Sequence, residues 1–265
     1  MTWTPNPLVG AAPARVPLPQ APLVRVIVQL RFPEILGLDE RAGVASFQER
    51  IRSEYPFLEQ ERSQQAAIGP AGLSAMAPPA VIWRFQDLSR QWRVSLGTHF
   101  LTLETVRYSM REDLLSRFRR LLDALEMTVK PTVRTGLGVR YVNRLTDWSI
   151  DELRTFVRPE LLGLDATNAA EHSTHLFTET AFPLDNGRLT CRYGRVPPGV
   201  AFDESVLDAL PIKSWVLDVD RTIEGEHPLA IDDVRSLVEQ GCERCNAFFR
   251  WAVTDDLLVR YGGKP

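Results

Sequence analysis

Apolar and polar residues alternate between Leu23 and Phe32, a stretch in which every second residue from Val24 onwards is Val, Leu or Phe. Alternation places the apolar side chains on one side of an extended chain, so it predicts a strand with one buried face. Runs rich in β-branched and aromatic residues predict the other strands, at residues 81–86, 91–105, 136–145, 174–184, 188–194 and 214–222. Asp185-Asn186-Gly187 separates two of these runs and predicts a tight hairpin, because Asn-Gly readily takes positive φ values.

Apolar residues at helical spacing predict four helices. Ser-x-x-Glu capping boxes beginning at Ser46, Ser109 and Ser149 mark the expected starts of three of them. The first is expected over residues 46–61, the second carries a stripe of Leu and Phe over residues 114–125, and the third ends at Pro159. The fourth and longest begins near Ile231, and its apolar stripe includes Cys242 and Cys245.

The order strand, helix, antiparallel strands, helix occurs twice along the chain. The segments Gln29-Leu30-Arg31-Phe32 and Val142-Asn143-Arg144-Leu145 also share an Arg before a closing apolar residue. We therefore expect an α+β fold of two similar halves, residues 23–130 and 131–265, each with two helices on a mainly antiparallel sheet. A proline-rich arm, residues 1–22, precedes them, and both halves are expected in one compact unit. Chance similarity between amphipathic strands is the alternative to duplication.

The composition removes several classes of function. The chain has 31 basic and 34 acidic residues and a net charge of -3, so no overall positive field favours nucleic acid. No stretch is long and apolar enough to span a membrane, and the arm lacks the pattern of a signal peptide. Three cysteines are too few for a secreted disulfide framework. These features predict a cytoplasmic protein. Of the basic residues 28 are Arg, which fits anion recognition or simply a GC-rich genome.

Cys242-Glu-Arg-Cys245 has the spacing of half a zinc site, which His172 and His175 could complete. Both cysteines nevertheless fall in the apolar stripe of a helix, where Cys acts as a small hydrophobe. In an extended segment the two histidines would point to opposite faces. We therefore expect buried, reduced and metal-free cysteines.

Common catalytic and cofactor motifs are absent from the sequence. There is no Walker lysine motif and no G-x-S-x-G, and Gly136-Leu-Gly138 lacks the third glycine of a dinucleotide fingerprint. Asp218 and Asp220 share one face of a strand, where they could bind a divalent cation or simply form a solvated face. We assign no catalytic residue, no cofactor and no metal site from the sequence.

Arginines on two strands form the most suggestive cluster. Arg140 and Arg144 share a strand face, Asn143 lies near the end of that strand, and Arg31 ends the comparable strand of the first half. Guanidinium groups bind phosphate and carboxylate through paired hydrogen bonds, so these residues are the candidate ligand-binding site. The alternative is that the arginines pair with carboxylates of the protein itself, such as Glu34, Glu104 or Asp147.

Three segments, residues 21–32 (APLVRVIVQLRF), 137–145 (LGVRYVNRL) and 248–257 (FFRWAVTDDL), carry a family resemblance. Together they resemble a sporadically distributed bacterial family of similar length that has no assigned activity. The resemblance implies a bacterial cytoplasmic origin and no mechanism. Arg25 stands where that family often has an acidic residue.

The expected function is that of a binding or accessory protein, because nucleophile, base and oxyanion donor cannot be assembled from the sequence. Its partner would be a small anionic ligand or another protein, and the sequence leaves a homo-oligomer open. A metal-assisted hydrolase using Asp218 and Asp220 is the first alternative. A structural subunit of a bacterial complex is the second.

Overall fold

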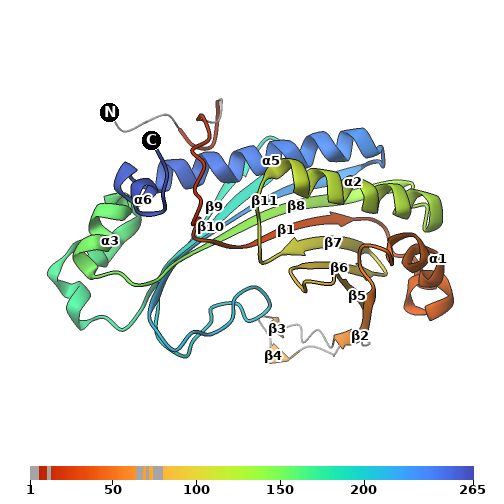
Figure 1. The fold of residues 1–265 in the computed structure, drawn as a ribbon, viewed down its shortest axis with the longest axis horizontal. Helices are drawn as coiled ribbons and strands as arrows, with labels where there is room; N and C mark the ends of the chain where they lie inside the picture. The colour runs from red at the N-terminus through yellow and green to blue at the C-terminus, as the bar shows by residue number, and fades with distance from the viewer. Residues whose placement is uncertain (1–5, 11–12, 64–67, 70–71, 74–79) are drawn as a thin grey trace. The chain divides into compact units, whose positions relative to one another are not determined.

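The computed structural model describes residues 6–10, 13–63, 68–69, 72–73 and 80–265 (Figure 1). It combines α-helices with antiparallel strands, which confirms the mixed α+β prediction at this level. Two compact units divide the chain. Unit 1 contains residues 1–26, 138–223 and 239–265, and unit 2 contains residues 27–137 and 224–238.

Unit 2 holds an antiparallel meander of β2 (Phe57–Ser63), β5 (Ala80–Gln86), β6 (Trp92–Gly97) and β7 (Phe100–Thr105), followed in strand order by β1 (Leu23–Arg31). The short strands β3 (Ile68–Gly69) and β4 (Gly72–Leu73) pair with each other. Helices α1 (Arg41–Ile51) and α2 (Arg111–Thr128) supply the apolar cover. Phe47 of α1 meets Phe85 of β5 edge to face, with ring centroids 5.9 Å apart. The predicted apolar stripe of α2 is buried, as expected.

Unit 1 contains β9 (Leu176–Leu184), β10 (Gly187–Val196), β8 (Val133–Leu145) from residue 138 onwards and β11 (Ser214–Pro228) up to residue 223. These strands neighbour one another in the order β8, β11, β10, β9. The hairpin of β9 and β10 turns at Asp185 and Asn186 as predicted, and its positive φ falls on Gly187. A Cβ at Gly187 would lie 2.1 Å from the carbonyl oxygen of Thr222, so this position requires glycine.

The long helix α5 (Ile231–Ala252) lies against one face of the unit 1 strands (Figure 1). The Cys245 thiol is 3.4 Å from the carbonyl oxygen of Val139 on β8 and 3.6 Å from that of Val219 on β11. Phe248 packs near Phe182 of β9, with centroids 6.1 Å apart. A Cβ at Gly241 of α5 would lie 2.7 Å from Cγ2 of Val139, so the odd-numbered side chains of β8 face α5. The side chains of Arg140 and Asp218 bond to each other, so the even-numbered residues of β8 and β11 share the other face.

Smaller elements complete unit 1. They are α3 (Ile150–Phe156), α4 (Pro159–Leu162), α6 (Asp255–Arg260) and the 3-10 turns Gly163–Ala166 and Asn168–His172; a further 3-10 turn, Leu36–Asp39, belongs to unit 2. Arg244 of α5 donates to the carbonyl oxygens of Pro7 and Gly10, so this part of the proline-rich arm is held by the helix. Within the described ranges no helix is both long and apolar enough to cross a bilayer.

Several predicted element boundaries were wrong. Helix α1 begins at Arg41 and ends at Ile51, so Ser46 lies inside the helix and caps nothing. Residues 57–63 form β2 instead of the end of that helix, because Pro56 follows it and the segment pairs with β5. Helix α2 starts after Met110 without a side-chain cap, so Ser109 forms no capping box. Pro159 opens α4 as its first residue, a position where its missing N–H costs nothing.

The predicted strand over residues 91–105 is two strands, β6 and β7, with a turn at Thr98 and His99. Residues 66–80 were expected to be a loop; residues 66–67, 70–71 and 74–79 of it lie outside the described part of the chain. The remainder includes β3, β4 and the first residue of β5. A duplication into two similar halves is not confirmed, and each unit draws on separate stretches of sequence.

Candidate functional site

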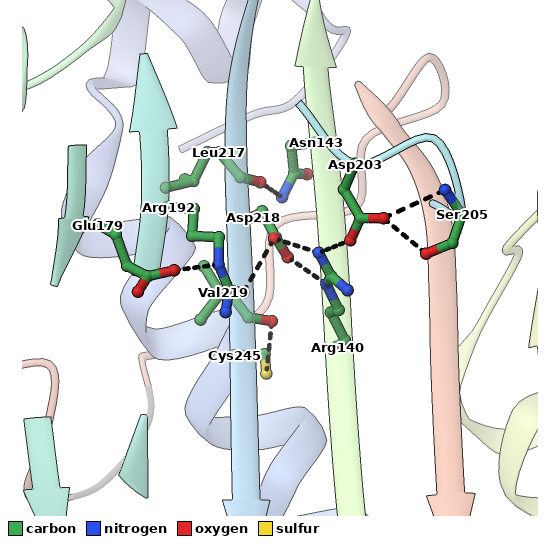
Figure 2. Close-up of polar contacts among 10 residues, drawn as sticks. All are labelled: Arg140, Asn143, Glu179, Arg192, Asp203, Ser205, Leu217, Asp218, Val219 and Cys245. Atoms are coloured by element: carbon green, nitrogen blue, oxygen red, sulfur yellow. Dashed lines mark hydrogen bonds and ion pairs between the residues drawn. The ribbon is translucent and has the colours of Figure 1, made fainter. Parts of the chain in front are cut away.

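Arg140 lies at the centre of a charged network on the face of β8 that points away from α5 (Figure 2). Its Nε and Nη2 donate to the two carboxylate oxygens of Asp218 on β11, at 2.9 and 2.7 Å. Nη2 also donates to Asp203 Oδ2 at 3.0 Å. Burial alone would lower the pKa of Arg140, but the hydrogen bonds and charges of Asp218 and Asp203 raise it above its ordinary value.

Asp218 is fully buried and accepts from a second guanidinium. Arg192 of β10, directly opposite Asp218 in the antiparallel register, places Nη1 3.4 Å from Asp218 Oδ2. Arg192 Nε donates to Glu179, its partner on β9. The network therefore runs across four strand-borne side chains, from Arg140 through Asp218 and Arg192 to Glu179. The solvated strand face considered for Asp218 is wrong, because this carboxylate is a buried counter-charge.

Arg144 lies four residues along the same face of β8 and is only 8% exposed. Its Nε donates to Ser214 Oγ at 3.0 Å, and its Nη1 donates to the carbonyl oxygen of Asp208 at 2.6 Å. Both acceptors are neutral, and no carboxylate in the described residues forms an ion pair with Arg144. Burial lowers the pKa of Arg144, and the charge of Asp208 only partly opposes this.

The other two candidate residues lie elsewhere. Asn143 is buried, and its side-chain amide donates to the carbonyl oxygen of Leu217 at 3.4 Å. Its odd position on β8 places it on the opposite face from Arg140 and Arg144. Arg31 belongs to unit 2, is exposed, and donates through Nε to Gln29 Oε1 at 2.9 Å. The structure thus brings Arg140 and Arg144 together on one face of one strand.

A connecting segment between β10 and β11 contacts both arginines; we call residues 197–213 the strap. Asp203 of the strap binds Arg140, and the carbonyl of Asp208 binds Arg144. Asp203 Oδ1 also accepts from the backbone N–H and the hydroxyl of Ser205, at 3.1 and 2.6 Å. Burial raises the pKa of Asp203, but the bonds from Ser205 and Arg140 outweigh it and hold that pKa below its ordinary value.

Asp220 shares the face of β11 that carries Asp218, yet it has a different environment. It is half-buried, and its side-chain carboxylate forms no hydrogen bond or ion pair with any residue that the structure describes. Burial raises the pKa of Asp220 above its ordinary value. The positive charge of Arg140 lowers this pKa, whereas the negative charge of the nearby Asp218 raises it further. A divalent cation between Asp218 and Asp220 would have to share Asp218 with two guanidiniums, which repel it.

The cysteines and histidines do not converge. Cys191, Cys242 and Cys245 are all buried thiols outside any disulfide, and burial was predicted for the last two. His172 and His175 are exposed, whereas Cys245 lies between α5 and the strands. Over the described ranges no group of three or more His, Cys, Asp or Glu side chains is arranged to hold a metal ion.

The alternative of internal pairing was correct for Arg140, but with different partners. Glu104 pairs with Arg93, whereas Arg140 binds Asp218 and Asp203. Asp203, Arg192 and Glu179 were missed by sequence reasoning. For Arg192 and Glu179 a signal existed, because a two-residue hairpin turn fixes their register.

The sequence matches no known family model and no curated protein. The bacterial family that it resembles through three segments therefore remains a prediction. The case for function rests on the geometry of the β8 arginines.

Proposed function

We propose that this chain is a binding or accessory protein that receives an anionic group at Arg144. The observation that carries the proposal is that Arg144, a residue 8% exposed, bonds through its guanidinium to a hydroxyl and a carbonyl and to no carboxylate among the described residues. A charge removed from water without a counter-charge costs several kcal/mol, so buried arginines are normally paired. A phosphate or carboxylate would bring a negative charge into direct contact with Arg144 through short charge-assisted hydrogen bonds, whereas Asp208 acts on it only through space.

Arg140 contributes to this site mainly by its position. Asp218 fixes its guanidinium plane from the buried side, and the contact to Asp203 is with a strap residue whose side chain is 31% exposed. An oxygen of the ligand can therefore replace Asp203 as the acceptor of one Arg140 N–H. Asn143 and Arg31 are left out of the proposed site, because the first lies on the other strand face and the second belongs to the other unit.

Titration calorimetry with inorganic phosphate, and separately with succinate, tests the proposal. Arg144→Gln should weaken binding about tenfold or more, since a charge-assisted hydrogen bond contributes about 1.5–3 kcal/mol. The melting temperature should stay constant or rise, because the substitution removes a buried charge that Asp208 only partly balances. Arg120→Gln is the control: it removes one positive charge from an exposed ion pair with Glu54 and should leave binding unchanged.

The opposite result would show that Arg144 is an internal clamp. That outcome is a loss of stability of about 1.5–3 kcal/mol in Arg144→Gln with anion binding absent from the wild-type protein. A structural subunit is then the better description. The metal-assisted hydrolase has less support, because both oxygens of Asp218 accept from guanidiniums.

We also retain internal duplication as a proposal. Its support is the shared Arg before a closing apolar residue in β1 and β8. It adds nothing to the case for the anion site, which lies wholly within unit 1.

A further inference from the structure

We propose that the strap acts as an internal ligand, and that the partner it excludes is an acidic peptide with an aromatic residue directly before an acidic one. This inference rests on the proposed anion site at Arg140 and Arg144. The strap already places a carboxylate on Arg140 and a main-chain carbonyl on Arg144, which are the two kinds of acceptor that a peptide offers.

The spacing of the two arginines fits an extended chain. They are four residues apart on one strand face, which corresponds to about 13 Å. The strap bridges them with Asp203 and Asp208, which are five residues apart in sequence. A peptide in extended conformation would cover the same distance with four residues.

Phe202, the residue before Asp203, indicates that the peptide also needs an aromatic side chain. Phe202 packs against Phe177 of β9, with ring centroids 4.8 Å apart and planes inclined at 33°. Phe177 is 38% exposed, so this contact leaves part of its ring open. The pair Phe202-Asp203 thus joins an aromatic contact on β9 to an ion pair on β8. Two adjacent side chains that contact separate strands define a recognition motif more narrowly than charge alone.

Exchange would be confined to the first part of the strap. Val206 and Leu207 are 3% and 5% exposed, and they anchor the segment that follows. Glu204 and Ser205 are exposed. Releasing Phe202 and Asp203 would leave Arg140 held by Asp218 through Nε and Nη2, and the N–H of Nη2 that Asp203 had accepted could donate to a new partner. Because the strap is covalently attached, it competes at a high effective concentration and lowers the apparent affinity of any added peptide.

The test uses a fluorescein-labelled peptide with the sequence of residues 200–208 (VAFDESVLD), followed by fluorescence anisotropy on the full chain. Asp203→Asn weakens the internal competitor, so this variant should bind the peptide about tenfold or more tightly than the wild-type protein. Glu204→Gln is the matched control: it removes the neighbouring exposed charge and should behave as the wild type. Peptides with Asp→Asn or Phe→Ala at the positions of Asp203 and Phe202 should each bind the Asp203→Asn protein at least tenfold more weakly.

Two results would overturn the inference: no peptide binding to the Asp203→Asn protein, or equal binding of the Asp→Asn peptide. Inorganic phosphate titrated into the same protein separates this failure from that of the proposed function. Phosphate binding that depends on Arg144, without peptide binding, leaves the anion site standing and removes the peptide. Loss of both phosphate and peptide binding refutes both proposals.

Discussion

Two neighbouring carboxylates on β11 show how strongly local environment decides the behaviour of a residue. Asp218 is buried but neutralised by Arg140 and Arg192, whereas Asp220 is half-buried and has no such partner among the described residues. Sequence reasoning placed both on one strand face correctly. It could not distinguish them, because the partners of Asp218 come from two other strands.

The raised pKa of Asp220 predicts a pH-dependent loss of stability. The folded state holds the proton more tightly than the unfolded chain, so stability falls as the pH rises from about 4 through the raised pKa. Asp220→Asn should therefore increase the free energy of unfolding at pH 7, because the amide stays neutral. The difference should vanish below about pH 4, where the wild-type carboxyl is protonated in both states.

Urea unfolding of both proteins between pH 3.5 and 8 measures this effect. Asp185→Asn, which changes an exposed carboxylate in the hairpin turn, serves as the control and should show no comparable gain at pH 7. A destabilised Asp220→Asn at neutral pH would mean that the ionised carboxylate has a stabilising role in the network.

Among the elements, capping boxes show what a short motif predicts and where it fails. Ser-x-x-Glu occurs three times at expected helix starts, but only Ser149 with Glu152 forms the reciprocal pair of hydrogen bonds. Ser46 follows residues that are themselves helical, and Ser109 precedes an extended N-cap at Met110. The motif works only where the backbone of its first residue is extended, which four residues of sequence do not specify.

Replacing Ser149 and replacing Ser46 are therefore expected to change the free energy of unfolding differently. Ser149→Ala should lower the free energy of unfolding by about 1 kcal/mol, because the N–H of Glu152 loses its acceptor. Ser46→Ala should be neutral or slightly stabilising, since Ser46 is exposed inside α1 and alanine has the higher helix propensity. Chemical denaturation of both variants measures the difference. Equal losses would contradict the assignment of the caps.

At the scale of the whole molecule, the apolar pattern predicted most elements but not how the chain is divided. Unit 2 takes residues 224–238 from far along the sequence, and Arg119 of α2 pairs with Asp232 from that stretch. Local periodicity carries no information about which distant segments meet. The contact between Asp203 of the strap and Arg140 could not be predicted either. The path of a long connection depends on the strands that it joins.

The three cysteines offer a measurement of how unit 1 opens. Cys191 on β10 and Cys242 and Cys245 on α5 all belong to this unit, and each is at most 1% exposed. Burial keeps the reagent away from these thiols, and it also raises the pKa of Cys191 and of Cys245, so less of the reactive thiolate forms at pH 8. Ellman's reagent should therefore label no thiol rapidly in native buffer and three in denaturant.

Labelling in increasing sub-denaturing concentrations of urea tests whether the thiols become accessible together. Cys191 of β10 lies opposite Val219 of β11, and the carbonyl oxygen of Val219 contacts the Cys245 thiol of α5. Because the strands and the helix pack together here, we expect the three thiols to react at a common rate that follows unfolding of the unit. Mass spectrometry of partly labelled protein should then show mainly zero or three labels. A stable species with one label in native buffer would mean that one of the cysteines reaches solvent without unfolding, which its burial in the structure contradicts.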